Sequence, residues 1–234
     1  TVCENNTGDC DLQNNFAKMD IAIQRYKFTR KPHNKDESNA FYTYDPDQCI
    51  LCGRCVEACQ NVEVNETLSN DYSEPHSRVV WDGGKPIGES SCVSCGHCVT
   101  VCPCNALLER TLQPDAGPFT SIKADTKRSM IDFIKALEDT TGAPPITAIS
   151  RIDVALRQQE IKRTKTVCPY CGVGCAFEMW TRGREILKVQ PVEEAPVNGI
   201  STCIKGKFAW DFVNAKERLT TPLIRENGQF REAT

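Results

Sequence analysis

Cysteines are unusually frequent in this chain, and they occur in groups. Fifteen of the 234 residues are cysteine, and many are separated from the next by only two or three residues. Thiolates on one tight loop can converge on a single metal ion or cluster, whereas a secreted disulfide scaffold would be a much shorter chain with an even cysteine count. The spacing therefore favours metal binding in a reducing compartment over a disulfide framework.

Two segments, CILCGRCVEAC and CVSCGHCVTVCP, share the spacing C-x2-C-x2-C-x3-C. Ferredoxins hold [4Fe–4S] clusters with this spacing, and in two-cluster ferredoxins the fourth cysteine of each motif binds the other cluster. The reason is geometric, because three cysteines wrap around one cluster while the fourth, on the following helix, points away. We therefore predict one quartet of Cys49, Cys52, Cys55 and Cys102, and another of Cys92, Cys95, Cys98 and Cys59.

Zinc is the alternative occupant, because two C-x2-C pairs can make a four-thiolate zinc site. A single tetrahedral zinc would use only half of these eight thiols, so two interleaved zinc sites would be needed. Cys104 is left over, and we predict a small buried apolar residue there. His97 lies inside the second motif, but that quartet is complete without it. His33 and His76 lie in polar loops and indicate no site.

A third group of cysteines follows a different pattern. VCPYCGVGCAFEMW supplies three cysteines and STCIKGKF, further along, supplies the fourth. Gly172 and Gly174 would let the loop approach an inorganic core and offer backbone N–H groups to its sulfurs, which would raise the reduction potential. We predict a third [4Fe–4S] site made by Cys168, Cys171, Cys175 and Cys203.

The stretch CPYCGVGC…CIKGKFAWDFVNAKERLTTPLI resembles the start of the molybdopterin oxidoreductases, in particular a formate dehydrogenase catalytic (alpha) subunit of the long cytoplasmic type. The resemblance covers essentially the whole chain. It implies that formate is oxidised at a molybdenum or tungsten bis-molybdopterin guanine dinucleotide centre, and that electrons leave through the [4Fe–4S] clusters. The family's catalytic residues lie downstream of anything matched here, so no catalytic residue can be named.

The same resemblance gives roles to three more residues. In the family a motif of one His and three cysteines holds a [4Fe–4S] cluster, and Cys3 and Cys10 match its second and third cysteines. The resemblance implies that the His, the first cysteine and a [2Fe–2S] domain precede Thr1, so that the chain is a fragment. Lys205 matches a family lysine between cluster and pterin, which makes it a candidate cofactor-binding residue and electron relay.

Two other functions stay open. One is a non-catalytic relay subunit like the complex I large subunit; the other is a different molybdopterin oxidoreductase such as nitrate reductase. The second complete cysteine quartet and the CxKG sequence favour the enzyme. The implied partner is an electron-acceptor subunit, either of the NAD/flavin type or a small quinone-linked membrane-associated one. We expect a hetero-oligomer in the cytoplasm, at most attached to the inner face of the membrane through that partner.

Composition limits the other classes. The net charge is −3 with acidic and basic residues interleaved, so no basic face predicts nucleic-acid binding, and no apolar run is long enough to span a bilayer. The expected fold class is α+β. The expected domains are a remnant of the His-containing cluster domain (1–30), a two-cluster ferredoxin-type domain (41–110), a helical linker (111–163), the molybdopterin oxidoreductase [4Fe–4S] domain (164–221) and the start of a pterin-binding domain (222–234).

The cysteine motifs need elements that hold them in place. Leu12, Phe16 and Met19 recur at helical spacing, which predicts a short amphipathic helix after Cys10. RVVW at 78–81 predicts a strand, with a turn at 82–84. Helices are expected at 127–142 and 150–161, and strands and turns beyond Lys165, including a hairpin whose turn is Asn-Gly at 227–228.

Overall fold

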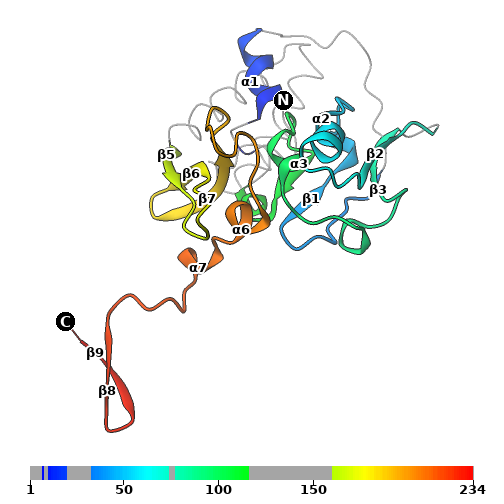
Figure 1. Ribbon diagram of the computed structural model, residues 1–234. Coiled ribbons are helices and arrows are strands. Elements are labelled where there is room, and N and C mark those ends of the chain that lie inside the picture. Colours follow the sequence, from blue (N-terminus) through cyan, green and yellow to red (C-terminus); the bar gives the residue numbers. More distant parts are fainter. Residues whose placement is uncertain (1–6, 8–9, 20–32, 74–76, 116–159, 234) are drawn as a thin grey trace, which may run out of the picture.

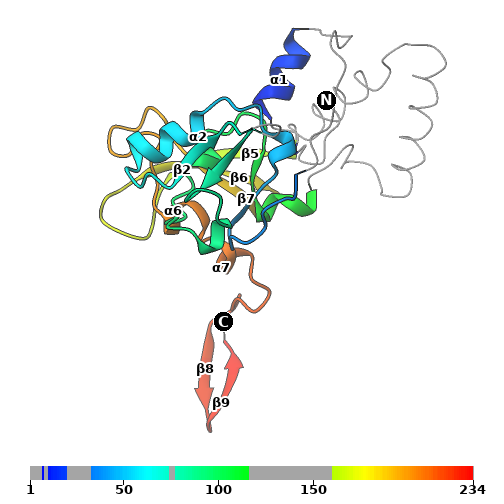
Figure 2. The same ribbon diagram turned by 90° about the vertical axis from the view of Figure 1, so that its right-hand side faces the viewer.

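The computed structural model describes residues 7, 10–19, 33–73, 77–115 and 160–233. Residues 33–115 form a first lobe and residues 160–214 a second, and helix α6 (Ile204–Phe208) lies between the two (Figure 1). The hairpin of β8 (Leu223–Glu226) and β9 (Gln229–Glu232) projects away from both lobes, as the turned view also shows (Figure 2). This confirms the expected Asn-Gly hairpin.

The first lobe is closed by a short antiparallel pair of strands. β1 (Tyr42–Tyr44) pairs with β4 (Leu107–Glu109), so the segments on either side of both cysteine motifs lie side by side. Helix α2 (Arg54–Glu57), which continues as one π-helical turn (Ala58–Val62), follows the first motif's loop, and α3 (His97–Thr100) follows the second's. Short 3-10 helices occupy Pro46–Gln48, Ile87–Glu89 and Arg110–Asp115.

Both helices begin after a glycine in the left-handed conformation, where side chains are strained. Gly53 has φ +75° and Gly96 has φ +80°, and each directly follows a cysteine. An added Cβ at Gly53 would meet nothing within 4 Å, whereas one at Gly96 would lie 2.6 Å from Cγ of Lys207. The two motifs therefore have the same local backbone, but only the second is pressed against helix α6.

An antiparallel hairpin separates the two motifs. The predicted strand at 78–81 is β3 (Arg78–Trp81), and it pairs with β2 (Leu68–Asp71). The predicted turn follows β3: residues 82, 83 and 84 all have positive φ. Leu68, Val79 and Trp81 are buried in the first lobe's core, and the ring of Tyr44 lies 5.0 Å from that of Trp81. The hairpin thus completes the core beside the cysteine loops.

The second lobe is a three-stranded antiparallel sheet in the order β5-β6-β7. Its strands are β5 (Lys162–Val167), β6 (Ala176–Arg182) and β7 (Glu185–Pro191). The β5–β6 loop carries the C-x2-C-x3-C segment. Helices α6 and α7 (Asp211–Asn214) contact β7, and Phe177, Val189 and Trp210 are buried between sheet and helices.

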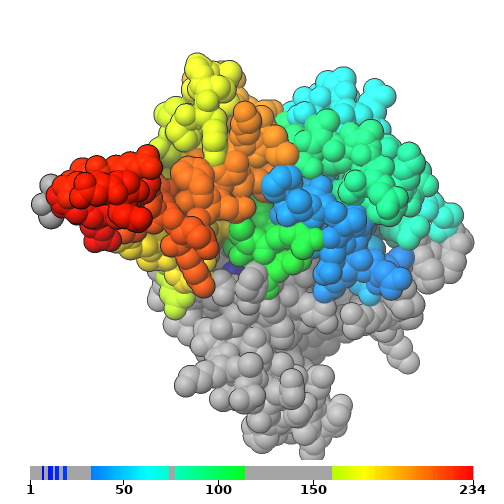
Figure 3. Space-filling view, turned by 90° about the horizontal axis from the view of Figure 1, so that it is seen from below, coloured from blue at the N-terminus to red at the C-terminus, as the bar shows by residue number. Residues whose placement is uncertain are grey.

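The two lobes share buried side chains. Phe208 of α6 belongs to the first lobe's core, where its ring stacks on Phe41 with centroids 5.1 Å apart. Leu187 of β7 packs with Leu108 and Leu112 of the first lobe. In the space-filling view the residues around α6, in orange, fill the space between the blue-green first lobe and the yellow strands (Figure 3). Burial of these apolar surfaces fixes one lobe against the other.

The short helix after Cys10 is confirmed as α1 (Asp11–Lys18), but the packing predicted for Leu12 and Met19 is wrong. The side chains of Leu12 and Met19 are 41% and 72% exposed. The helix is held by its first turn instead, where the N–H of Leu12 donates to the carbonyl of Pro103 at 2.8 Å. A backbone bond thus takes the place of the expected apolar contact.

The helices expected at 127–142 and 150–161 lie almost wholly outside the described residues. At the end of the second, Glu160 is helical and Ile161 is not, so the boundary falls one residue earlier than expected. Within the described part of the chain, no helix combines the length and the apolar character needed to cross a bilayer.

Candidate metal centres

The first group of thiols gathers beside α2. The pKa of Cys55 is raised to about 12, first by burial and then by the negative charge of Cys102, Cys49 and Cys52. Burial, Cys102 and Cys52 also raise the pKa of Cys49. Cys102, from the second motif, thus acts on thiols of the first.

The second group gathers beside α3. The pKa of Cys95 is raised to about 11, first by burial and then by Glu63, Cys92 and Cys59. Burial, Cys92 and Cys95, together with Cys55 of the first group, hold the pKa of Cys98 well above its ordinary value. Cys59 thus comes to the second group from the first motif, as Cys102 comes to the first group from the second. Crossed ligation of the two clusters stays a prediction.

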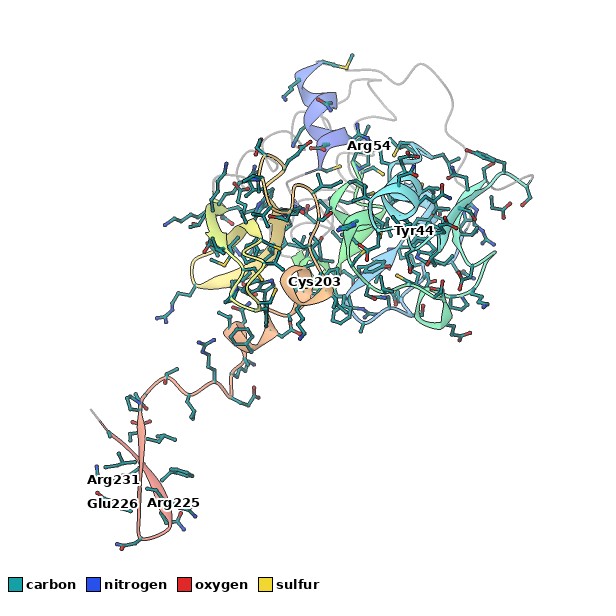
Figure 4. The ribbon with its side chains drawn as sticks, viewed as in Figure 1. Tyr44, Arg54, Cys203, Arg225, Glu226 and Arg231 are labelled. Carbon is teal, nitrogen blue, oxygen red and sulfur yellow. The ribbon has the colours of Figure 1, made fainter. Side chains whose placement is uncertain are left out.

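The third group lies on the second lobe, facing α6. Burial and then Cys168, Cys171 and Cys203 raise the pKa of Cys175. The N–H of Cys168 donates to the carbonyl of Cys175 at 2.8 Å, which closes the loop between β5 and β6. Cys203 immediately precedes α6 and lies where the two lobes meet (Figure 4).

The chemistry of these donor sets fits iron–sulfur clusters. In each group, burial together with mutual repulsion disfavours the ionisation of at least one thiol, namely Cys55, Cys95 and Cys175. A cationic iron core removes that cost, because thiolates are its ligands. Such clusters carry single electrons, and the protein sets their potential through burial, charge and hydrogen bonds to sulfur.

Two tyrosines that the sequence reasoning missed also contact the thiols. Tyr42 and Tyr44 lie on one face of β1, because side chains two apart on a strand point the same way. The hydroxyl of Tyr42 lies 3.3 Å from Sγ of Cys92, and that of Tyr44 hydrogen-bonds Cys49. Burial raises both tyrosine pKa values, so the hydroxyls keep their protons and donate. The sequence FYTY at 41–44, just before the first motif, was the feature that could have indicated these tyrosines.

His97 is a buried structural link between the lobes. Its Nε2 accepts a hydrogen bond from the N–H of Thr202 at 3.2 Å, and its Nδ1 lies 3.3 Å from a carboxylate oxygen of Glu63. Burial lowers its pKa, so the ring is neutral and its proton lies on Nδ1. Glu63, Cys95 and His97 do bring metal-ligand atoms together, but Cys95 is shared with the second quartet.

Two lysines on α6 have contrasting environments. Lys205, singled out by the sequence, is exposed in the described structure. Lys207 is buried instead, with Nζ 3.0 Å from Oε1 of Glu109 and 2.8 Å from the carbonyl of Val189. Sequence reasoning missed Lys207, because nothing in KGKF distinguishes which lysine faces the core.

The remaining candidates are the leftover cysteines. Cys104 is buried as predicted, yet its Sγ lies 3.9 Å from Sγ of Cys102. Its hydrogen bond lowers the pKa of Cys102 to about 6, while Cys104 itself keeps its proton. Cys10 is also buried, with Sγ 3.5 Å from the carbonyl oxygen of Pro103. Cys3 lies outside the described residues.

The other two histidines fall in different parts of the chain. Nδ1 of His33 lies 3.0 Å from Asp47, a local contact within the first lobe. His76 lies outside the described residues.

Comparison with known families identifies the class of each lobe. Residues 48–106 match the 4Fe-4S dicluster domain, and residues 161–215 match the molybdopterin oxidoreductase Fe4S4 domain. The chain therefore contains two kinds of 4Fe-4S domain, a dicluster domain and the Fe4S4 domain found in molybdopterin oxidoreductases, with mixed helix and strand content.

The relatives are long proteins of the same kind. "Probable oxidoreductase YjgC" of Bacillus subtilis is 60% identical over 233 residues, which are 100% of this chain and 24% of that protein. "Putative formate dehydrogenase YrhE", also of Bacillus subtilis, is 57% identical over 237 residues, again 100% of this chain and 24% of that protein. The chain thus spans about a quarter of the length of these relatives.

One solved structure also aligns, an NAD+-reducing [NiFe]-hydrogenase in the H2-reduced state. It has a TM-score of 0.41 and 23% identity, and the alignment covers 52% of this chain and 55% of that one. A similarity of this size is too low to support an inference.

Proposed function

We propose that this chain is the electron-transfer part of a formate dehydrogenase catalytic subunit. It would carry electrons from formate oxidation at a molybdenum or tungsten pterin centre to an acceptor subunit. Three [4Fe–4S] clusters would be held by Cys49, Cys52, Cys55 and Cys102; by Cys92, Cys95, Cys98 and Cys59; and by Cys168, Cys171, Cys175 and Cys203. The relatives and both family matches support this proposal.

The contact between the lobes is the observation that carries the proposal. Thr202, the residue before Cys203, donates to His97, the residue before Cys98. The third quartet is therefore linked to the second by this hydrogen bond and by the peptide bonds that join Thr202 to Cys203 and His97 to Cys98. A relay needs such fixed, close spacing, whereas a scaffold with three independent structural metals does not. On this arrangement the second quartet is the natural neighbour of the third, and the first quartet lies beyond it.

The chain's own residues prepare the sites for electron transfer. Tyr42, Tyr44 and Cys104 donate hydrogen bonds to cluster-binding sulfurs, and the shared core around Phe208 holds the lobes at a constant separation. Lys205 is exposed at the start of α6, close in sequence to Cys203. We propose that this exposed surface faces the pterin centre in the whole enzyme.

Anaerobic mixing of the full-length protein with formate tests the reaction. Formate should bleach the visible cluster absorbance, and the Lys205→Ala variant should keep its iron and pterin but bleach more slowly. Bleaching that requires a different substrate, with formate inactive, would favour another molybdopterin oxidoreductase. Nitrate reoxidation of chemically reduced clusters would indicate a nitrate reductase. Full iron content with no pterin would favour a non-catalytic relay.

A further inference from the structure

A buried ion pair joins the two lobes next to the second quartet. Nζ of Lys207, on α6, lies 3.0 Å from Oε1 of Glu109, on β4, and the two side chains are 0% and 7% exposed. The ammonium also donates to the carbonyl of Val189 at 2.8 Å and to Oε1 of Gln190 at 3.0 Å. All three contacts are acceptors and stabilise the ammonium, against burial, which is the largest effect and lowers the pKa of Lys207.

The stem of Lys207 lies against the loop of the second motif. A Cβ added to Gly96 would be 2.6 Å from Cγ of Lys207 and 2.9 Å from the ring of Phe208. Gly96 stands between Cys95 and His97, one residue from one ligand and two from another. The charge of Lys207 acts on the thiol of Cys98 and on the ring of His97. A fully buried cation therefore faces this quartet.

The other charges nearby do not cancel that cation. Glu109 is shared with a second cation, because both Lys207 and Lys188 lower its pKa against the effect of burial. Lys207 is the member of the pair whose side chain lies against the loop of the second motif. Glu63 opposes it beside Cys95, but the Glu63 side chain is 28% exposed, and solvent weakens its field.

We propose that Lys207 raises the reduction potential of the cluster held by Cys92, Cys95, Cys98 and Cys59 and so makes it the preferred electron acceptor beside the third quartet. This inference rests on the cluster assignment of the proposed function. A reduced cluster carries one more negative charge, and a fixed cation in a site with little water stabilises that charge. The buried acceptors hold the ammonium of Lys207 in a fixed position.

The test is a redox titration of the anaerobically purified full chain, followed by electron paramagnetic resonance with chemical mediators. Cys52→Ser and Cys95→Ser variants first assign the signals of the first and second quartets. Removing Lys207 alone would leave Glu109 buried without its partner, which can prevent folding. The Lys207→Met/Glu109→Gln double variant avoids that, and Lys85→Met, which loses an exposed lysine of the first lobe, where the second quartet lies, is the control.

The double variant should retain its iron and should shift the second quartet's midpoint to a lower potential, by more than the control does and by more than the first quartet shifts. Glu109→Gln alone keeps the cation but removes its counter-charge, so it should raise the same midpoint. Unchanged midpoints in iron-loaded variants would overturn the role of Lys207 and leave an ordinary ion pair. Absence of iron from the unsubstituted chain would instead contradict the proposed function, and formate is not needed for either result.

Discussion

The backbone N–H of Thr202 donates a hydrogen bond to Nε2 of His97 at 3.2 Å, and both residues are buried. This bond ties the segment before Cys203 to the second cysteine motif, so it contributes to stability as well as to the spacing of the sites. Its removal therefore tests how tightly the lobes are joined.

His97→Leu should lower the free energy of unfolding by roughly 1–3 kcal/mol, because it leaves the buried N–H of Thr202 without an acceptor. The measurement is the urea midpoint, followed anaerobically by tryptophan fluorescence. His97→Gln, whose amide oxygen can accept the bond, should lose less. Equal midpoints for the Leu variant and the unsubstituted chain would show that the link contributes nothing.

Gly96→Ala and Gly53→Ala form a matched pair, because both glycines have left-handed backbones of nearly equal φ. Gly53→Ala should cost roughly 1–2 kcal/mol of stability from backbone strain alone. Gly96→Ala should cost about 1–3 kcal/mol more, because its Cβ would overlap Lys207 and Phe208, both of which are held by buried contacts. Equal losses of stability in the two urea titrations would mean that α6 moves away from the added Cβ at no cost in free energy.

Cys59→Ser should damage the cluster of the second quartet, although Cys59 belongs to the first motif. Its charge acts on Cys95, and Cys102 correspondingly acts on Cys55. Paramagnetic resonance of the reduced chain can distinguish the two clusters, and Cys102→Ser should give the reciprocal result. Loss of the first quartet's signal in the Cys59 variant would disprove crossed ligation.

Cys104→Ala should leave the iron content unchanged and lower the midpoint potential of the first quartet's cluster. The thiol of Cys104 donates to Sγ of Cys102, and hydrogen bonds to cluster sulfurs raise the potential. Cys104→Ser keeps a donor and should shift the midpoint less. If the Ala and Ser variants titrate like the unsubstituted chain, Cys104 only fills space.

The cysteine motifs were predictable from sequence, because their spacing alone determines which sulfurs one loop can bring together. The strand at 78–81 was predictable for a similar reason, since it is short, apolar and followed by glycines. Contacts between the lobes were not. No local pattern shows that Lys207 is buried and Lys205 exposed, because that depends on how α6 lies between β4 and β7.

The apolar face of α1 shows a second limit of prediction from sequence. Leu12 and Met19 have helical spacing, and the helix forms, but both side chains remain exposed. Periodicity predicts an element and the face it could bury, whereas burial requires a neighbouring surface. The hydrogen bond from Leu12 to Pro103 could not be anticipated, because it joins backbone groups far apart in the chain.

Metal and sulfide analysis of the chain, expressed and purified without oxygen, tests the central claim most directly. Three [4Fe–4S] clusters require about twelve iron atoms and as many acid-labile sulfides per chain, more if Cys3 and Cys10 help to hold another cluster. The account predicts a brown protein with at least that content, whose absorbance bleaches on chemical reduction. Stoichiometric zinc without sulfide, in a folded chain, would contradict it.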